Sequence, residues 1–388
     1  DEANDPLGQC RVGIAHRQSI ADRAPTDLAG DCRRLTSALA VSSVPMLAEP
    51  FASRWKRRAR TIPLMLVATL VGALASPAIV AAAAVVDLAK GRFRLPTVRV
   101  SLFLLQYGIN DSVEILLAPL YWVAAGFGTR LDQPKSIARH ERLQRWSVDV
   151  LARRAELLLG LRLDLDPVGS DALTPGPVIV LCRHVNIVDA SLPTLVYQRL
   201  GYRTRGVIMA ELLADPGFDL IYARTGSVFI PRDNGPEAIA MLRTLGQNLD
   251  STTAVVIFPE GRLFRPDRLD RAKARLVLEN PSRAERLESL AHVLPPRPGG
   301  VLALVESIAA DVVVIAHTGL DHLGSFTELA KAVPLRHPIH VTAWRVPADQ
   351  IPAGVGERIA WLDAQWLLVD DWVARHQDTS SPKRQAAP

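Results

Sequence analysis

A histidine and an aspartate stand five positions apart directly after an apolar, β-branched run. Val178–Cys182 predicts a buried strand, and His184 and Asp189 follow it. Histidine suits the role of a base near neutral pH, and an acid bonded to its other ring nitrogen would fix the tautomer and stabilise the imidazolium. Residues five apart do not share a helix face, so the two meet only if His184 precedes a helix and Asp189 lies in its first turns. Because the chain has nine histidines, a histidine that merely caps a helix remains the alternative.

A second group sets a glycine and an arginine on either side of a short apolar run. Gly226 precedes Val228–Ile230, which contains Phe229, and Arg232 follows it. This order places a fixed cation at the end of a strand, where arginine suits bidentate recognition of a phosphate. Taken alone, the group fits an ordinary surface arginine equally well.

A third group forms a turn after another apolar run. The strand expected at Ala254–Phe258 is followed by Pro259, Glu260, Gly261 and Arg262. Gly261 allows the backbone to approach a ligand closely. Glu260 fits a phosphate site only if it binds a hydroxyl or orients an arginine, so a common turn at a strand end is the alternative.

The elements that must position these groups alternate along the chain. Helices are expected over Ser136–Gly160 and Val188–Leu200. The expected strands are Val178–Cys182, Gly206–Met209, Val228–Ile230, Ala254–Phe258, Val312–Ala316 and Ile339–Val346. Strands separated by helices predict an α/β domain with a mostly central sheet, and such sheets usually place their sites at strand ends.

Two apolar stretches precede this pattern. Thr61–Val86 has no charged residue and is long enough to cross a bilayer, which needs about 20 residues. A buried core helix is the alternative. Val100–Thr129 carries Asn110, Asp111 and Glu114. The acids make a lipid-facing span costly, so we expect a re-entrant or interfacial helix, or a second span whose acids face protein.

The net charge of +5 and the pI near 9.3 indicate an anionic partner. Basic residues cluster beside the first apolar stretch rather than among stacking aromatics, which favours anionic lipid head groups over nucleic acid. The cluster comprises Arg54, Lys56, Arg57, Arg58 and Arg60. Cys10, Cys32 and Cys182 form no metal-ligand pattern, so we expect neither a metal site nor a disulfide framework.

Taken together and in this order, the three groups resemble the glycerolipid acyltransferase superfamily, which includes the lysophosphatidate acyltransferases. The family pattern is H-x4-D, then G-x-x-F-I-x-R, then F-P-E-G. It is matched here by His184, Asp189, Gly226, Phe229, Ile230, Arg232, Phe258, Pro259, Glu260 and Gly261. The resemblance covers roughly residues 140–375 and extends to the Leu294–Gly300 segment and to Trp361, Trp366 and Trp372, which are similar to the lysocardiolipin and plant-type branch.

The chain departs from the family pattern at three places. Arg183 stands where the family often has Asn, and Arg262-Leu263 stands where it commonly has Thr-Arg. The fourth family block usually centres on a proline, but Val312–Ala316 has none and is followed by His317. These departures put the identity of the acceptor in doubt more than the type of reaction.

The resemblance implies an α/β fold with a central mixed sheet flanked by helices, and N-terminal hydrophobic membrane helices. It also implies acyl transfer from acyl-CoA or acyl-carrier protein, as co-substrate, to the free hydroxyl of lysophosphatidate, giving phosphatidate. His184 and Asp189 would be catalytic, with no other cofactor. The substrate-binding residues would be Gly226, Phe229, Arg232, Glu260, Gly261 and Arg262, with Arg297 as a further phosphate contact.

Other interpretations remain open at this stage. The acceptor could be another lysophospholipid or a glycolipid, and the donor could be a phospholipid in a transacylase. A membrane-tethered lipid-binding protein without catalysis is a different class of function, favoured only by the altered third and fourth blocks. The expected location is the cell membrane, with the catalytic domain on the cytoplasmic face.

The expected organisation has four parts. Residues 1–60 would be a disordered basic segment, in which Met46 could be a natural start, and 61–129 would be membrane-anchoring helices. Residues 130–377 would form the acyltransferase domain, and 378–388 a disordered tail.

Overall fold

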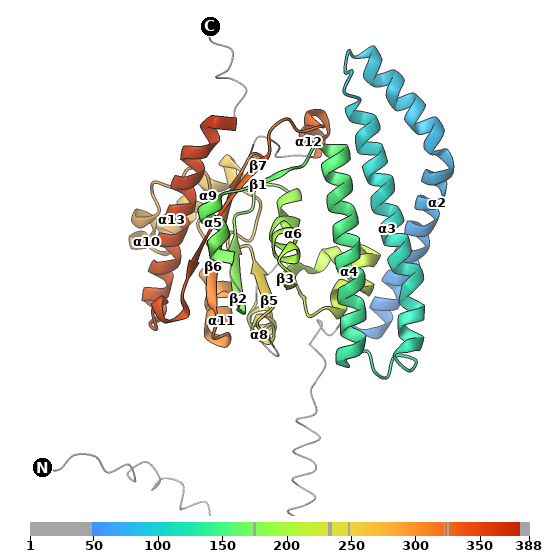
Figure 1. Cartoon of the computed structure of the whole chain (residues 1–388). Helices are drawn as coiled ribbons and strands as arrows, with labels where there is room; N and C mark the ends of the chain where they lie inside the picture. The colour runs from blue at the N-terminus through green and yellow to red at the C-terminus, as the bar shows by residue number, and fades with distance from the viewer. Residues whose placement is uncertain are drawn as a thin grey trace, which may run out of the picture. The chain divides into compact units, whose positions relative to one another are not determined.

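A seven-stranded sheet lies at the centre of the computed structural model (Figure 1). The structure describes residues 49–380 except 174–175, 232–234, 247–248, 322 and 324–325, so the expectations for residues 1–48, Arg232 and the end of the tail lie outside it. The strands are β1 (Leu163–Leu165), β2 (Val178–Cys182), β3 (Arg203–Met209), β4 (Val228–Ile230), β5 (Thr253–Ile257), β6 (Asp311–Thr318) and β7 (Ile339–Val346).

The sheet is mixed, as expected. Its strand order is β1-β7-β6-β2-β5-β3-β4, and each neighbouring pair is parallel except β6 with β7. All six expected strands are present, although β3 begins at Arg203 and β6 extends at both ends. The short edge strand β1, with Asp164 at its centre, was not expected.

Helices cover both faces of the sheet, because alternate strand residues point to opposite sides. One apolar cluster joins Ile179, Leu181 and Val255 to helices α8, α9, α11 and α13. The other joins Val178, Val180 and neighbouring strand residues to α6 and α12, with side chains of α3 packed against it. Strand β2 is fully buried between the two clusters.

Proline begins many of the helices, where its missing N–H costs no hydrogen bond. Apart from the two long N-terminal helices, the α-helices are α4 (Pro134–Arg154), α5 (Pro167–Ser170), α6 (Leu192–Arg199), α7 (Pro216–Leu220), α8 (Pro236–Thr244), α9 (Pro266–Glu279), α10 (Pro281–Arg286), α11 (Pro298–Ser307), α12 (Phe326–Ala332) and α13 (Val355–Ser380). Short turns of other helix types are η2 (Ala155–Leu159), η3 (Asp171–Leu173), η4 (Val188–Ser191), η5 (Ala210–Ala214), η6 (Tyr222–Arg224) and η7 (Ala348–Gln350).

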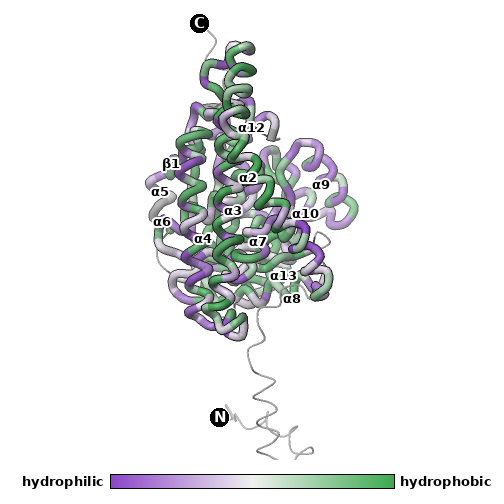
Figure 2. The backbone as a smooth tube through the Cα atoms, turned by 90° about the vertical axis from the view of Figure 1, so that its right-hand side faces the viewer, coloured by the Kyte–Doolittle hydropathy of each residue, from purple (hydrophilic) through white to green (hydrophobic). Residues whose placement is uncertain are grey.

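The two apolar stretches form a helical hairpin, α2 (Phe51–Ala89) and α3 (Pro96–Ala124), which is largely hydrophobic in Figure 2. Residues 51–60, expected within the disordered segment, are instead the first turns of α2. Buried Asp87 joins the helices, because its carboxylate accepts hydrogen bonds from the N–H groups of Thr97 and Val98 at the start of α3. By length and composition, each helix could cross a membrane.

The polar residues of α3 are buried in the protein. Of the alternatives for this stretch, the structure therefore supports a helix whose acids face protein. Asn110, Asp111 and Glu114 are buried, and the Asn110 amide donates to Ser147 of α4. A Cβ added to Gly217 of α7 would lie 2.5 Å from a Glu114 oxygen. Helix α3 is therefore packed against the α/β domain.

Two arginines of the N-terminal basic cluster bind within the protein. Arg57 and Arg58 both pair with Asp219 of α7, at 2.9 and 2.8 Å, and the Asp219 side chain is buried. Lys56 and Arg60 of the same cluster are exposed. The cluster thus fixes the start of α2 on the domain as well as presenting charge to the solvent.

Candidate active site

The carboxyl ends of three adjacent strands meet at one edge of the sheet. Strands β6, β2 and β5 are neighbours and run in the same direction. The segment with His184 follows β2, the Phe258–Gly261 turn follows β5, and His317 lies near the end of β6. Such an edge is where open α/β sheets place their sites.

His184 and Asp189 are in contact, as their spacing predicts. His184 precedes the short turn η4, which contains Asp189, and the His184 Nδ1 to Asp189 Oδ1 distance is 2.5 Å. Asp189 Oδ2 accepts from the N–H groups of Val185 and Asn186, at 2.6 and 2.8 Å. The carboxylate acts as the acceptor, so the proton belongs on Nδ1 and Nε2 is left as the basic nitrogen. The Asp189 side chain is 0% exposed and that of His184 is 19% exposed, so the base reaches the surface while its partner is enclosed.

The Phe258–Gly261 turn holds the backbone and ring of His184. The His184 ring lies against the Phe258 ring, with centroids 4.5 Å apart. One Glu260 oxygen accepts from His184 N–H at 3.0 Å, and the other accepts from Leu294 N–H at 2.9 Å. Burial raises the pKa of Glu260 to about 7, against the effect of these two hydrogen bonds. Both oxygens therefore bind main chain, which makes Glu260 a support for His184 in addition to any contact with substrate.

Arginines gather on the outside of the same turn. Gly261 has φ +64°, and a Cβ there would lie 3.2 Å from Arg297 Cδ, so glycine is needed both for the turn and for the arginine that lies on it. Arg297 N–H donates to Pro259 O at 2.8 Å. Partial burial lowers the pKa of Arg297, and the charges of Arg262 and Arg275 lower it further. This grouping of cations suits an anionic ligand.

Gly226, the first residue of the second sequence group, does not lie at the strand ends that carry His184. Gly226 precedes β4 and lies at its amino end, beside Arg205 of β3, because a Cβ there would lie 2.9 Å from Arg205 Nε. Phe229 is buried within β4. The structure does not bring Gly226 to the edge that carries His184, and Phe229 is only 1% exposed. Arg232 lies outside the described residues.

The sequence alone assigned no role to Arg183, Asp321 and His317, which contact one another next to His184. Arg183 is fully buried, pairs with Asp321, and donates to the backbone oxygens of His317 and His292. His317 is also fully buried and contacts the backbone of Arg183. The sequence signal for Arg183 and His317 was their position. Each directly follows an expected apolar strand, because those strands end at Cys182 and Ala316.

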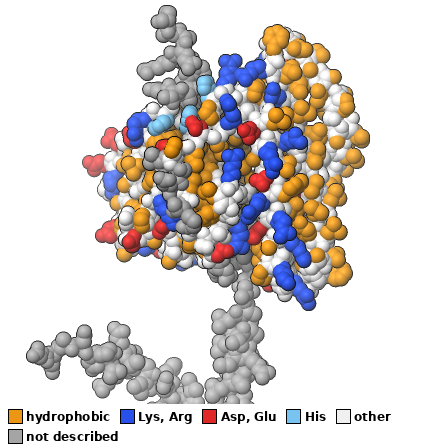
Figure 3. All heavy atoms as spheres, viewed as in Figure 1, with side chains coloured by type: hydrophobic (Ala, Val, Ile, Leu, Met, Phe, Trp, Pro, Cys, Tyr) orange, Lys and Arg blue, Asp and Glu red, His pale blue; other side chains and the backbone are white. Residues whose placement is uncertain are grey.

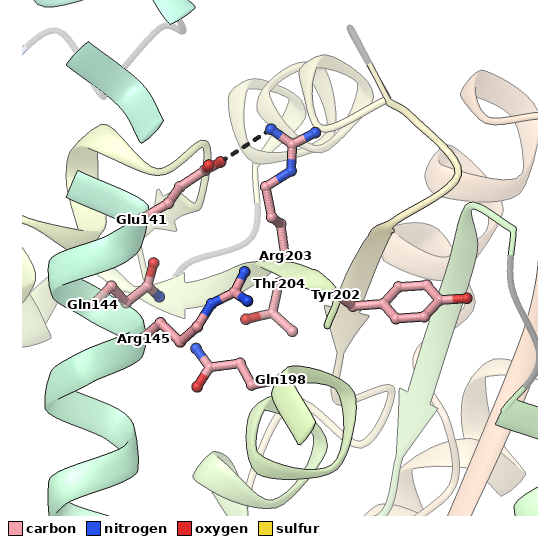
Figure 4. A pocket seen from close by; sticks show the side chains of 7 residues that line it. All are labelled: Glu141, Gln144, Arg145, Gln198, Tyr202, Arg203 and Thr204. Carbon is pink, nitrogen blue, oxygen red and sulfur yellow. Dashed lines mark hydrogen bonds and ion pairs between the residues drawn. The ribbon is translucent and has the colours of Figure 1, made fainter. Parts of the chain in front are cut away.

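A small polar hollow lies elsewhere, between α4, α6 and the start of β3 (Figure 4). Its volume is about 10 Å³, which is room for about one water molecule. Arg203 points toward Glu141 across it, with an N–O distance of 3.5 Å. It lies at the amino end of β3 and is too small to receive a lipid.

Comparison with known proteins assigns the domain that holds this site. Residues 166–317 match the family model described as Acyltransferase, and they contain both His184 and Glu260. The chain therefore contains an acyltransferase domain, which confirms the expected resemblance at the level of that domain. The finer lysocardiolipin and plant-type branch stays a prediction.

Among solved structures, the chain is similar to the crystal structure of the 1-acyl-sn-glycerophosphate (LPA) acyltransferase PlsC from Thermotoga maritima. The sequence identity is 17%, the match covers 68% of this chain and 97% of that chain, and the TM-score is 0.41. No curated protein matches the sequence.

Proposed function

We propose that the protein transfers a fatty acyl group from acyl-CoA or acyl-carrier protein to the free hydroxyl of lysophosphatidate, forming phosphatidate for phospholipid biosynthesis. The observation that carries the proposal is the contact of partly exposed His184 with buried Asp189, within an acyltransferase domain. The cations beside the same turn supply the reason to choose a phosphorylated acceptor.

His184 acts as the general base in this proposal. Its Nε2 removes the proton from the acceptor hydroxyl as the oxygen attacks the thioester carbonyl carbon, and Asp189 stabilises the imidazolium. The tetrahedral intermediate then collapses, the C–S bond breaks, and the proton on His184 passes to the leaving thiolate. No covalent acyl-enzyme forms, because acceptor and donor are bound together.

Three backbone N–H groups near His184 are already used. Those of Val185 and Asn186 donate to Asp189, and that of Val188 donates to the Asn186 side chain at 3.0 Å. They are therefore not free to stabilise the oxyanion of the tetrahedral intermediate. Another donor must supply that stabilisation.

The acceptor phosphate binds to the arginines beside the Phe258–Gly261 turn. Arg297 and Arg262 are exposed beside Gly261, whose lack of a side chain allows close approach. A guanidinium pair can share the oxygens of one phosphate through charge-assisted hydrogen bonds. Arg232 is proposed to complete this site, as the family pattern implies.

In this proposal, the α2–α3 hairpin holds the site at a membrane surface. Apolar side chains gather along the side of the molecule formed by the hairpin, and Lys and Arg form a band beside them over α4 (Figure 3). Exposed basic residues of α4 are Lys135, Arg142, Arg153 and Arg154. Apolar surface beside positive charge suits a membrane with anionic lipids, and we assign this surface to the cytoplasmic face.

The test is acyl transfer by membranes containing the protein or its His184→Ala variant. Radiolabelled acyl-CoA and acyl-carrier protein are each supplied with lysophosphatidate, other lysophospholipids and a glycolipid acceptor. We expect labelled phosphatidate from the parent protein and a loss of at least about 100-fold in the variant, because general-base catalysis contributes about two to four powers of ten.

Each of the other possible results of this assay would change the proposed function in a specific way. Labelling of a different acceptor would change the assigned substrate, and transfer without any thioester would indicate a transacylase. Equal rates for the parent and the His184→Ala variant would refute the role of His184. Lipid binding without transfer to any acceptor would indicate a non-catalytic protein.

A further inference from the structure

Asp189 lies between two histidines, one exposed in part and one enclosed. Its Oδ1 contacts His184, and its Oδ2 lies 3.5 Å from Nε2 of His317. His317 Nε2 also lies 3.1 Å from the backbone oxygen of Arg183, the residue that precedes His184. One ring therefore contacts both the partner of the base and the segment that carries the base.

These contacts fix the tautomer of His317. Both neighbours of Nε2, Asp189 Oδ2 and Arg183 O, are acceptors, so Nε2 must carry a proton. Nδ1 is buried and has no hydrogen-bond partner among the described residues. Burial lowers the pKa of His317, and the charge of Arg183 lowers it further, while Asp189 and Asp321 oppose this. The ring is thus neutral, with Nε2 as its donor.

The surroundings of His317 hold it in place. Arg183 donates to His317 O at 2.7 Å and pairs with Asp321, whose pKa falls because Arg183 is adjacent. The other ionisable groups around the pair are Glu260, which binds the backbone of His184, and Cys182, at the end of β2. Strand β6 therefore holds the Nε2 donor of His317 at the Arg183 carbonyl, 3.5 Å from Asp189 Oδ2.

We propose that His317 is a positioning residue for the acyl transfer, which tunes His184 by donating its Nε2–H to the Arg183 carbonyl beside Asp189. The inference rests on the proposed function for its kinetic test. Two backbone N–H groups occupy Oδ2 of Asp189 and leave Oδ1 for the catalytic ring. The Nε2–H of His317, hydrogen-bonded to the Arg183 carbonyl, lies 3.5 Å from Oδ2. The Nε2–H dipole also offsets part of the negative charge that His184 experiences.

This geometry predicts a change in pH dependence when the donor is removed. Without the dipole, Asp189 stabilises the imidazolium form of His184 more strongly, so a higher pH is needed to generate the free base. The acidic limb of the rate profile should therefore move to higher pH. A residue that only filled space would lower the rate without moving this limb.

Three variants distinguish a hydrogen-bond donor role of His317 from a role in filling space. His317→Gln can place an amide N–H near the position of Nε2, His317→Asn is polar but too short to reach it, and His317→Leu is apolar and similar in size. We expect the Gln variant to retain near-parental kcat. The Asn and Leu variants should lose up to about 10-fold in kcat, as expected for one hydrogen bond, with KM for the thioester nearly unchanged.

The measurements are kcat and KM from pH 5 to 9, with thermal unfolding as a check on folding. If the Leu variant does not fold, the comparison of Asn with Gln decides the question. A parental profile in the Asn or Leu variant overturns the inference, as does a Gln variant that behaves like Asn.

A second readout needs no substrate. The rate at which diethyl pyrocarbonate modifies His184, followed by peptide mass spectrometry, reports the fraction of free base at each pH. If the parent protein acylates no acceptor, the proposed function fails, and this titration still decides the role of His317. The inference then stands only if the titration moves to higher pH in Asn and Leu and not in Gln.

Discussion

The guanidinium of Arg297 lies on the turn that holds His184, and nearby arginines repel its charge. A Cβ at Gly261 would lie 3.4 Å from Arg297 Nε, and both Arg262 and Arg275 lower the Arg297 pKa. Like charges held near one another at an exposed site are stabilised when an anion binds. We therefore propose that this group of arginines serves to bind an anion.

Arg297→Met should weaken binding of the phosphorylated acceptor. We expect KM for lysophosphatidate to rise about 10-fold, because a charge-assisted hydrogen bond is lost, while kcat changes less than two-fold. Initial rates with lysophosphatidate and with monoacylglycerol, which has no phosphate, provide the measurement. Arg375→Met, at an exposed position of α13 where Arg375 pairs with Asp371, is the control. An equal rise in KM for both acceptors would contradict the assignment.

The part of the site that the sequence predicts is the part made by local chain geometry. His184 and Asp189 meet because the five-residue spacing spans one loop and the first turn after it. The contact of Glu260 with Leu294, and that of His317 with Asp189, depend on which strands are neighbours. The order of strands is a property of the folded sheet, so these contacts could not be found from spacing alone.

At the scale of elements, Glu260 joins the ends of two strands to a third segment. Its carboxylate binds the backbone after β2 and the backbone of Leu294, ahead of α11, while its own backbone follows β5. The group is buried, and burial raises its pKa from 4.5 to about 7. The protonated form is therefore favoured in the folded protein relative to the unfolded chain.

Glu260→Gln should remove one source of pH-dependent stability. A raised pKa in the folded state gives stability that is fully present below about pH 4.5 and is lost as pH rises through about 7. The loss amounts to about 3–4 kcal/mol at most, since one pKa unit corresponds to about 1.4 kcal/mol. Thermal unfolding of parent and variant at pH 5 and pH 8 should show a smaller pH effect in the variant. Identical pH effects in the two proteins would show that Glu260 is charged throughout.

Three strands, β2, β4 and β7, have the expected bounds. The apolar run of β2 shows the pattern of a strand buried on both faces most clearly, because all five of its residues are buried. β1 was missed because three residues with Asp164 at the centre carry no such pattern, and β1 becomes a strand only through pairing with β7. Tertiary contact decides the structure there.

At the scale of the whole described chain, α2 is fixed at both ends and exposed between them. Asp219 pairs with Arg57 and Arg58 near the start of the helix, and Asp87 binds the start of α3 near its end. Leu64, Leu70 and Leu74 of α2 are 69, 60 and 75% exposed. A contiguous apolar surface of this kind marks an interaction site, and these side chains have no role in the interior.

Replacing Leu64, Leu70 and Leu74 together by serine should therefore release the protein from membranes without unfolding it. Each leucine that a bilayer buries contributes about 1.5–3 kcal/mol, so we expect partition into vesicles to fall on the order of 100-fold or more. Vesicle sedimentation with phosphatidylcholine alone and with added phosphatidylglycerol measures this partition.

Isoleucine at the same three positions keeps the apolar area and is the matched control. The thermal unfolding temperature should stay near that of the parent, because exposed side chains add little to the core. If the serine variant sediments with vesicles as the parent does, the exposed face of α2 is not the membrane contact, and the band of basic residues over α4 would have to hold the protein there alone.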